Sequence, residues 1–220
     1  MDAASTDGKS VMVEKTPRHI RALPLIRRLA PQAKLILMAR DGRDAAASIG
    51  WRYNGDYSGG HDRWVSDNTL LVGALSDPLA YLLRYEDLID NPARELRGLV
   101  QFLGLRFEPA MMEYHQRQHL WFGKGEVQQA DGVGKKHEDL RNWQVNQPIF
   151  DGRGRWKTDL PADVLAQFSV EPAKALMQRL GYGEGARPGR LSGPRGSRMD
   201  RLRHLLKQWR RAIGQRLRRR

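Results

Sequence analysis

Residues 33–48, AKLILMARDGRDAAAS, place an arginine where a buried strand should end and a helix should begin. The apolar run at 35–38 is typical of a strand buried on both faces, and Arg40 follows that strand directly. A helix is expected over residues 43–52, because Asp44 suits the positive end of a helix and a run of alanines continues it. Ligands of open parallel sheets bind at the carboxyl ends of the strands. Arg40 is therefore a candidate for clamping an anion.

Composition narrows the class of protein. The chain has 220 residues, enough for one domain with its own core, and no cysteine, which excludes disulfides and thiolate chemistry. No apolar run approaches the length of a membrane span, and the polar N-terminus lacks the apolar segment of a signal peptide. We therefore expect a cytoplasmic protein.

The net charge of +13 is concentrated at one end of the chain. Residues 186–220 contain thirteen Lys or Arg and one acid, a net of +12, which leaves +1 for residues 1–185. We accordingly expect a domain over residues 1–185, followed by a basic linker and helix over residues 186–220. The pI describes this tail and not the domain.

The tail carries the pattern of a basic amphipathic helix from Met199 onward. Its apolar residues recur at steps of three or four, and arginines occupy the other face. Such a helix suits an anionic membrane surface, giving a peripheral association through residues 199–220, or a groove on a partner. A helix packed on its own domain is the alternative. Nucleic acid is disfavoured as a partner, because Trp209 is the tail's only aromatic residue.

Strand and helix patterns alternate along the rest of the chain, which predicts an α/β domain with a mainly parallel sheet. Residues 121–155 are rich in glycine and are expected to form a long loop. The predicted strands are 11–13, 34–39 and 79–85, and the predicted helices are 18–30, 43–52, 61–76, 91–104 and 160–180.

Four stretches together resemble the sulfotransferases that use 3'-phosphoadenosine 5'-phosphosulfate (PAPS). They occur in the expected order along the chain: EKTP at 14–17, RDGRDAAAS at 40–48, RYEDLIDNPARELRGLVQFLGL at 84–105 and GRWKTDL at 154–160. The resemblance implies a three-layer domain like that of the P-loop NTPases. It also implies transfer of a sulfonate from PAPS to a hydroxyl or amine acceptor, which the sequence leaves open between carbohydrate, lipid and small phenol.

The resemblance assigns roles in nucleotide binding. Arg40 and Ser48 would hold the 3'-phosphate, Tyr85 would lie beside the adenine, and Arg153 and Arg155 of the late loop would cover the phosphate. A planar guanidinium and a hydroxyl suit a dianionic phosphate. Each residue also has a structural alternative. Arg40 could pair with a nearby acid, and Tyr85 could be a half-buried strand residue. The serine and the two loop arginines could face solvent.

Lys15 is the residue that the resemblance assigns to the transfer step. Catalysis of such an in-line displacement rests mainly on positioning and charge stabilisation, and a lysine can steady the transferring sulfonate. A surface lysine paired with Glu14 is the alternative. Cytosolic members carry a histidine where this chain has Pro17, so Glu14 and His19 are the nearby candidate bases.

The family's first strand and its 5'-phosphosulfate loop belong ahead of EKTP, where only thirteen residues precede Glu14. DGKS at 7–10 ends like a phosphate loop, but Ala3 stands where that loop has glycine. We therefore expect a chain without the N-terminal lobe and with impaired turnover. A non-catalytic, basic-tailed binding protein on the same scaffold is the second hypothesis.

No metal site is predicted. His115 and His119 are four residues apart, but the sequence shows no third ligand near them, and polar surface histidines are the simpler interpretation.

Overall fold

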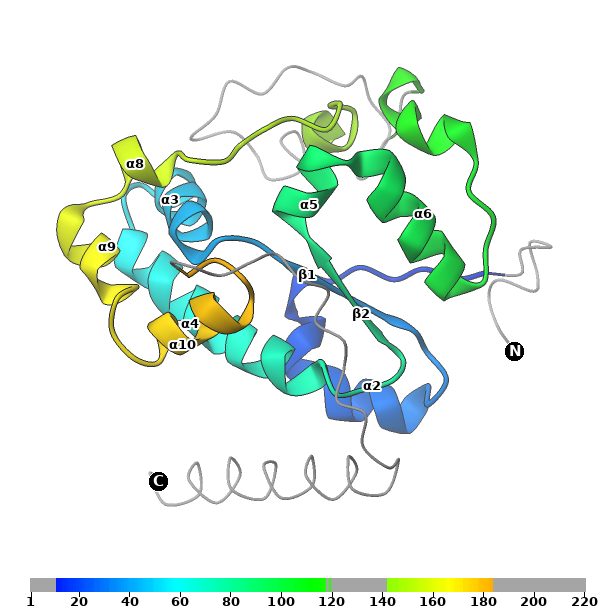
Figure 1. The fold of residues 1–220 in the computed structure, drawn as a ribbon, viewed down its shortest axis with the longest axis horizontal. Coiled ribbons are helices and arrows are strands. Elements are labelled where there is room, and N and C mark those ends of the chain that lie inside the picture. The colour runs from blue at the N-terminus through cyan, green and yellow to red at the C-terminus, as the bar shows by residue number, and fades with distance from the viewer. Residues whose placement is uncertain (1–10, 118, 120–141, 184–220) are drawn as a thin grey trace. The chain divides into compact units, whose positions relative to one another are not determined.

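The computed structural model describes residues 11–117, 119 and 142–183, and the chain divides into two units, Met1–Ala33 and Lys34–Arg220 (Figure 1). The first unit contains a 3-10 helix, η1 (Pro17–Ala22), and the α-helix α2 (Leu23–Leu29). A single helix over 18–30 was predicted. The interruption follows from Pro24, which has no N–H to bond the preceding turn and lies instead in the first turn of α2.

The predicted strand at 11–13 is wrong. Residues 11–16 have no regular structure, and Met12 and Val13 are 70% and 79% exposed. A strand is stable only when a neighbouring strand satisfies its backbone groups. Within the described part of the first unit no such neighbour exists, so the apolar pattern alone does not form a strand.

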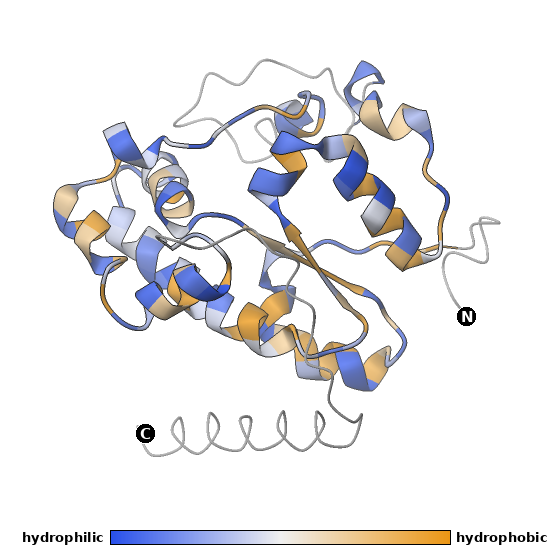
Figure 2. Cartoon of the chain, viewed as in Figure 1, coloured by the Kyte–Doolittle hydropathy of each residue, from blue (hydrophilic) through white to orange (hydrophobic). Residues whose placement is uncertain are grey.

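The second unit is built on two parallel strands, β1 (Leu35–Ala39) and β2 (Ala80–Arg84). Leu37 lies opposite Leu82, and Ala39 lies opposite Arg84 at the carboxyl end. The strands lie at the centre of this unit, and Figure 2 shows both as largely hydrophobic. This pairing confirms the predicted α/β class with a parallel sheet.

Burial of β1 differs from the expectation. Leu37 and Ala39 are 5% and 2% exposed, whereas Ile36 and Met38 are 42% and 56% exposed. The strand therefore buries one face fully and leaves the other partly open. An unbroken apolar run carries no alternation, so the sequence could not reveal which residues face outward.

The crossover between the strands consists of α3 (Gly42–Arg52) and α4 (Tyr57–Ala74), which pack against each other. The Asp41 side chain caps α3 by accepting the Arg43 N–H, and Asp56 caps α4 by accepting the Gly59 N–H. This second cap explains why α4 begins four residues before the predicted helix. Trp64 and Leu71 of α4 are 4% and 5% exposed and belong to the core.

Two helices follow β2 directly. The first is α5 (Tyr85–Asp90), which the sequence analysis did not predict, and the second is α6 (Pro92–Leu103), which it did. Asn91 caps α6, and Gly104 ends it in the left-handed conformation with φ of 79°. The short 3-10 helices η2 (Pro109–Met112) and η3 (Tyr114–Gln116) come next.

Two short helices, α9 (Ala162–Gln167) and α10 (Ala173–Arg179), replace the single helix predicted over 160–180. A further short helix, α8 (Trp156–Asp159), comes just before them. Pro161 and Pro172 stand at the breaks, where a missing N–H prevents an α-helix from continuing. Both α9 and α10 pack against α4, and Phe168 and Leu180 are 6% and 1% exposed.

Part of the predicted loop at 121–155 is described, and residues 142–145 within it form a helical turn. Residues 121–141 of that loop and the predicted basic tail lie outside the described residues. In the described ranges, no helix is both long enough and apolar enough to cross a membrane.

Candidate functional site

Arg40 lies at the carboxyl end of β1, against the aromatic ring of Tyr85. Because Ala39 is in register with Arg84, the next residues of the two strands meet, and the Arg40 Cζ lies 4.7 Å from the centroid of the Tyr85 ring. Arg40 Nη2 donates a hydrogen bond to the Gly152 carbonyl oxygen. Its Nε is buried and has no hydrogen-bond partner among the described residues. The guanidinium therefore keeps one donor that no described group uses, and protein atoms cover this donor in the structure.

The backbone around Arg40 is held from two sides. Trp64 Nε1 donates to the Arg40 carbonyl oxygen at 3.0 Å, and the Asp41 N–H donates to Glu86 at 2.9 Å. The other oxygen of Glu86 accepts the Tyr182 hydroxyl at 2.7 Å. Burial, with the adjacent Glu86 charge, raises the pKa of Tyr182, so this hydroxyl stays a donor. These bonds fix the end of β1.

The late loop lies along Tyr85. The Tyr85 hydroxyl donates to the Phe150 carbonyl oxygen at 2.8 Å and accepts the Gly152 N–H at 3.0 Å. With the Arg40 bond to Gly152, these contacts place the glycine-rich segment beside the strand ends, more than 60 residues away in sequence. Tyr85 therefore positions this loop, and its place beside the adenine stays a prediction.

Asp44 holds the next part of the late loop. Its carboxylate is 2% exposed and accepts the Gly154 N–H at 2.9 Å and the Trp156 N–H at 3.2 Å. The Arg43 Cζ also lies 4.3 Å from the Trp156 ring centroid. From the sequence, Asp44 was expected only as an acid at a helix terminus. Its contacts with the late loop were missed because burial cannot be seen in the sequence.

Ser48 lines a hollow of about 310 Å³ on the same helix. Its other lining residues are Ile49, Trp51, Arg52, Tyr53, Arg63 and Gln144. Arg40 is not among them, so the structure does not gather the two predicted phosphate ligands around one cavity. Arg155 approaches the hollow, because its Cζ lies 5.5 Å from the Trp51 ring centroid. Arg52, one helical turn after Ser48, is a cationic residue that the sequence analysis missed.

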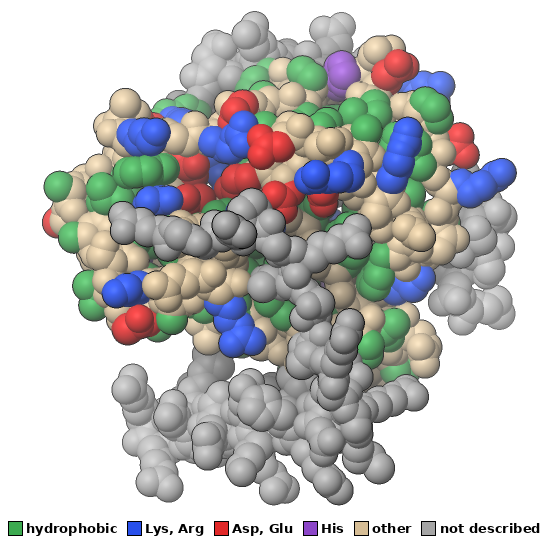
Figure 3. Space-filling view, in the orientation of Figure 1, with side chains coloured by type: hydrophobic (Ala, Val, Ile, Leu, Met, Phe, Trp, Pro, Cys, Tyr) green, Lys and Arg blue, Asp and Glu red, His purple; other side chains and the backbone are tan. Residues whose placement is uncertain are grey.

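Both predicted loop arginines bind carboxylates. Arg153 contacts Asp151 at 2.8 Å and Asp90 at 2.5 Å, and Arg155 contacts Asp159 at 2.8 Å. The hydrogen bonds from Thr158 and Arg155 lower the pKa of Asp159, and the two acids raise that of Arg153. Acidic and basic side chains lie next to one another across the upper part of the face in Figure 3. An incoming phosphate must compete with these carboxylates for the loop arginines.

The Asp151–Arg153 pair predicts a pH dependence. Hydrogen bonds from the Arg153 side chain and its backbone N–H lower the pKa of Asp151 from 3.8 to about 2. A lowered pKa stabilises the fold above pH about 4, and this contribution is lost as the pH falls from 3.8 toward 2. We expect the Asp151 carboxyl to titrate near pH 2 by NMR, and nearer 3.8 in Arg153→Ala. A midpoint near 3.8 in the wild-type protein would contradict the pairing.

The predicted catalytic residues belong to the first unit. Lys15 lies in the irregular segment before η1 and is exposed. The two candidate bases contact each other, with Glu14 Oε2 2.7 Å from His19 Nδ1, and Glu14 also accepts the Thr16 hydroxyl at 2.7 Å. This geometry keeps Glu14 and His19 together as an exposed acid–imidazole pair.

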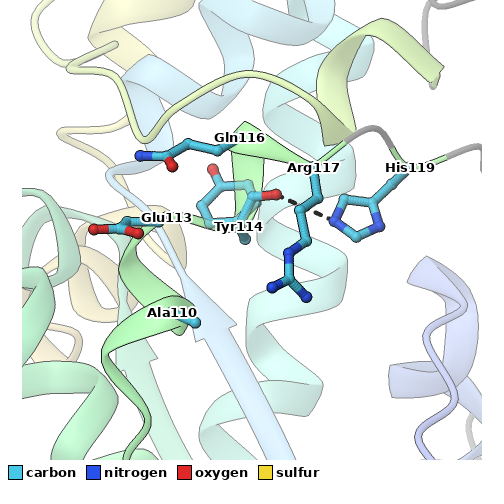
Figure 4. A pocket seen from close by; sticks show the side chains of 6 residues that line it. All are labelled: Ala110, Glu113, Tyr114, Gln116, Arg117 and His119. Carbon is cyan, nitrogen blue, oxygen red and sulfur yellow. Dashed lines mark hydrogen bonds between the residues drawn. The ribbon is translucent and has the colours of Figure 1, made fainter.

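A second hollow, of about 450 Å³, lies over η2 and η3. Figure 4 shows Arg117 and His119 on one side of Tyr114 and Glu113 on the other. The Tyr114 hydroxyl donates to the Gln147 carbonyl oxygen at 2.7 Å, and burial raises the pKa of Tyr114. The hollow offers charged and amide groups beside apolar surface, and it is lined by Ala110, Glu113, Tyr114, Gln116, Arg117 and His119.

Comparison with known proteins points to the sulfotransferases. Residues 2–109 match the model of the sulfotransferase family. Protein-tyrosine sulfotransferase 1 of Danio rerio is 25% identical over 206 residues, covering 89% of this chain and 55% of that protein. Protein-tyrosine sulfotransferase A of Caenorhabditis elegans is 24% identical over 196 residues, covering 83% of this chain and 48% of that protein. This chain thus spans about half the length of these curated relatives.

Among solved structures, the sulfotransferase domain from the curacin biosynthetic pathway aligns with a TM-score of 0.43 and 19% identity, over 76% of this chain and 65% of that chain. The family model over residues 2–109 and the relatives, which align with 83–89% of the chain, together support a sulfotransferase family domain.

Proposed function

We propose that this protein is an enzyme that transfers a sulfonate from PAPS to a hydroxyl acceptor. The observation that carries the proposal is the attachment of the late loop to α3. Asp44 binds both neighbours of Arg155, and Gly152 binds Arg40, so loop and helix meet where the predicted nucleotide ligands lie. The match of residues 2–109 to the sulfotransferase family model favours this enzyme over a non-catalytic binding protein on the same scaffold.

In this proposal the 3'-phosphate is the main recognition element. The Ser48 hydroxyl and the guanidinium groups of Arg52 and Arg155 lie at or near one hollow and offer charge-assisted hydrogen bonds to a dianion, and Arg40 would join them once its buried Nε is uncovered. Arg155 would exchange its exposed bond to Asp159 for the phosphate. The exchange costs little, because an exposed ion pair stabilises by about 0–1 kcal/mol. Tyr85 offers its ring to the adenine.

The transfer step breaks the bond between sulfur and the bridging phosphate oxygen and forms a bond from sulfur to the acceptor oxygen. Lys15 would stabilise the negative charge on the departing oxygen. The acceptor proton would pass to a base, for which Glu14 and His19 are the candidates in this chain. Their contact orients the imidazole, as a carboxylate partner commonly does.

The acceptor that we propose is a tyrosine hydroxyl in a peptide. The names of both relatives support it, since each is a protein-tyrosine sulfotransferase. The hollow over η2 and η3 also suits a peptide, because its lining offers charged and amide groups that can bind a peptide backbone. Carbohydrate hydroxyls are the comparison class in the assay.

The assay is transfer of labelled sulfonate from PAPS to tyrosine peptides, carbohydrates and small phenols. We expect label in the tyrosine peptide at the impaired rate that the sequence predicts, and a further fall of about tenfold or more in Lys15→Ala, because a stabilising charge is lost. Lys174→Ala removes an exposed lysine of α10 and serves as the matched control. Equal transfer by Lys15→Ala would remove Lys15 from the mechanism. Absence of label in every acceptor would contradict the proposed activity.

A further inference from the structure

The Asp44 side chain is buried, which is unusual for a charged group. It is 2% exposed, and burying a carboxylate is costly unless hydrogen bonds or charges compensate it. Asp44 lies in the first turn of α3, where an acid often caps its own helix. That cap is already provided by Asp41, which accepts the Arg43 N–H. The carboxylate of Asp44 is therefore available for another partner.

Its partners are two backbone N–H groups of the late loop. Oδ2 accepts from Gly154 and Oδ1 accepts from Trp156, residues that lie 110 and 112 positions further along the chain. Gly154 has a φ of 80°, a left-handed conformation that residues with a side chain rarely adopt. This conformation lets alternate N–H groups of the loop reach one carboxylate.

The residue between these two amides is Arg155. Its main chain is thus held on both sides, while its side chain extends to Asp159 and to the Trp51 ring. Trp51 lines the hollow that also contains Ser48, and Ser48 lies one helical turn after Asp44 on the same face of α3. Asp44 therefore sets the position of Arg155 relative to Ser48.

We propose that Asp44 is a positioning residue for the nucleotide site, which holds Arg155 beside the Ser48 hollow without touching the nucleotide itself. This inference rests on the proposed function, because it gives Arg155 a phosphate to bind. The inference predicts that Asp44 strengthens nucleotide binding, although its negative charge alone would weaken it. By charge alone, an acid near a phosphate weakens binding, so its removal should strengthen binding. By position, its removal should weaken binding.

Asp44→Asn is the main variant, because it keeps the shape of the side chain. Its single carbonyl oxygen can accept one N–H, while its amide group faces the other N–H and repels it. We expect adenosine 3',5'-bisphosphate to bind about fivefold more weakly, and about tenfold more weakly in Asp44→Ala, by calorimetry. Asp62→Asn, which neutralises an exposed acid of α4, is the matched control and should not weaken binding.

Two further measurements separate positioning from general stability. Amide exchange of residues 150–157 should accelerate in Asp44→Asn, while exchange of β1 and β2 stays as in the wild-type protein. In the Arg155→Ala background, Asp44→Asn should cause no further loss of affinity, because its effect passes through Arg155. Unchanged or tighter binding by Asp44→Asn, or full additivity with Arg155→Ala, would overturn the inference. A wild-type protein without preference for the 3'-phosphate would instead overturn the proposed function, and accelerated loop exchange would still support the attachment.

Discussion

Arg40→Ala is expected to lower the affinity for adenosine 3',5'-bisphosphate by about 10- to 100-fold, to the level of AMP. A charge-assisted hydrogen bond contributes about 1.5–3 kcal/mol, and Arg40 offers at least its unpartnered Nε at the end of β1. Affinity for AMP should change little, because AMP lacks the 3'-phosphate. Calorimetry with both nucleotides measures the two effects together.

Two companion variants make this result specific. Arg40→Lys keeps the charge but loses the planar guanidinium, so it should recover only part of the preference. Arg94→Ala removes an arginine of α6 whose side chain is 62% exposed, and should leave the preference intact. If Arg40→Ala kept the wild-type ratio of affinities, Arg40 would not be the 3'-phosphate ligand.

Trp64→Ala is expected to lower the free energy of unfolding by about 3–5 kcal/mol, as large aromatic deletions in cores do. Trp64 is 4% exposed, meets the Phe168 ring edge-on with centroids 5.7 Å apart, and donates Nε1 to the Arg40 carbonyl oxygen. The deletion leaves a cavity and removes the partner of a backbone oxygen. Denaturant titration measures the change.

The comparison residue is Trp51, which is 40% exposed. Trp51→Ala should lower the free energy of unfolding by about 1 kcal/mol or less, because its ring is half in water already. Trp64→Phe keeps most of the volume but loses the hydrogen bond, and should fall between the two. A loss below about 1 kcal/mol in Trp64→Ala would mean that the core does not depend on this side chain.

Local patterns were sufficient to predict much of the second unit. The apolar run before Arg40 forms β1, and the Asn91 cap and Gly104 stop bound α6 as expected. These signals act between near neighbours, through capping bonds and a glycine that adopts positive φ. The parallel pairing followed from the alternation of strands and helices, because a parallel crossover needs a helix between its strands.

The errors in the predicted fold occur where local pattern is not sufficient. Residues 11–13 have the composition of a strand but no neighbouring strand within the described first unit. Leu160 to Leu180 has helical spacing, but Pro161 and Pro172 divide it into short helices. In both cases a missing backbone hydrogen bond decides the outcome.

The candidate site shows the same limit. Motif resemblance selected Arg40, Ser48 and Tyr85 one by one. The structure places Arg40 against Tyr85, whereas Ser48 lines a hollow that includes neither of them. Attachment of the late loop through Asp44 could not be predicted from sequence. An acid in the first turn of a helix is ordinary, and its two partners lie more than 100 residues away.

The most direct test of the account is a calorimetric comparison of two nucleotides on the 220-residue chain. Adenosine 3',5'-bisphosphate and AMP differ only in the 3'-phosphate that Arg40, Ser48 and Arg155 are proposed to bind. The account predicts that the bisphosphate binds more tightly by about tenfold or more. Equal affinities for the two nucleotides would contradict it.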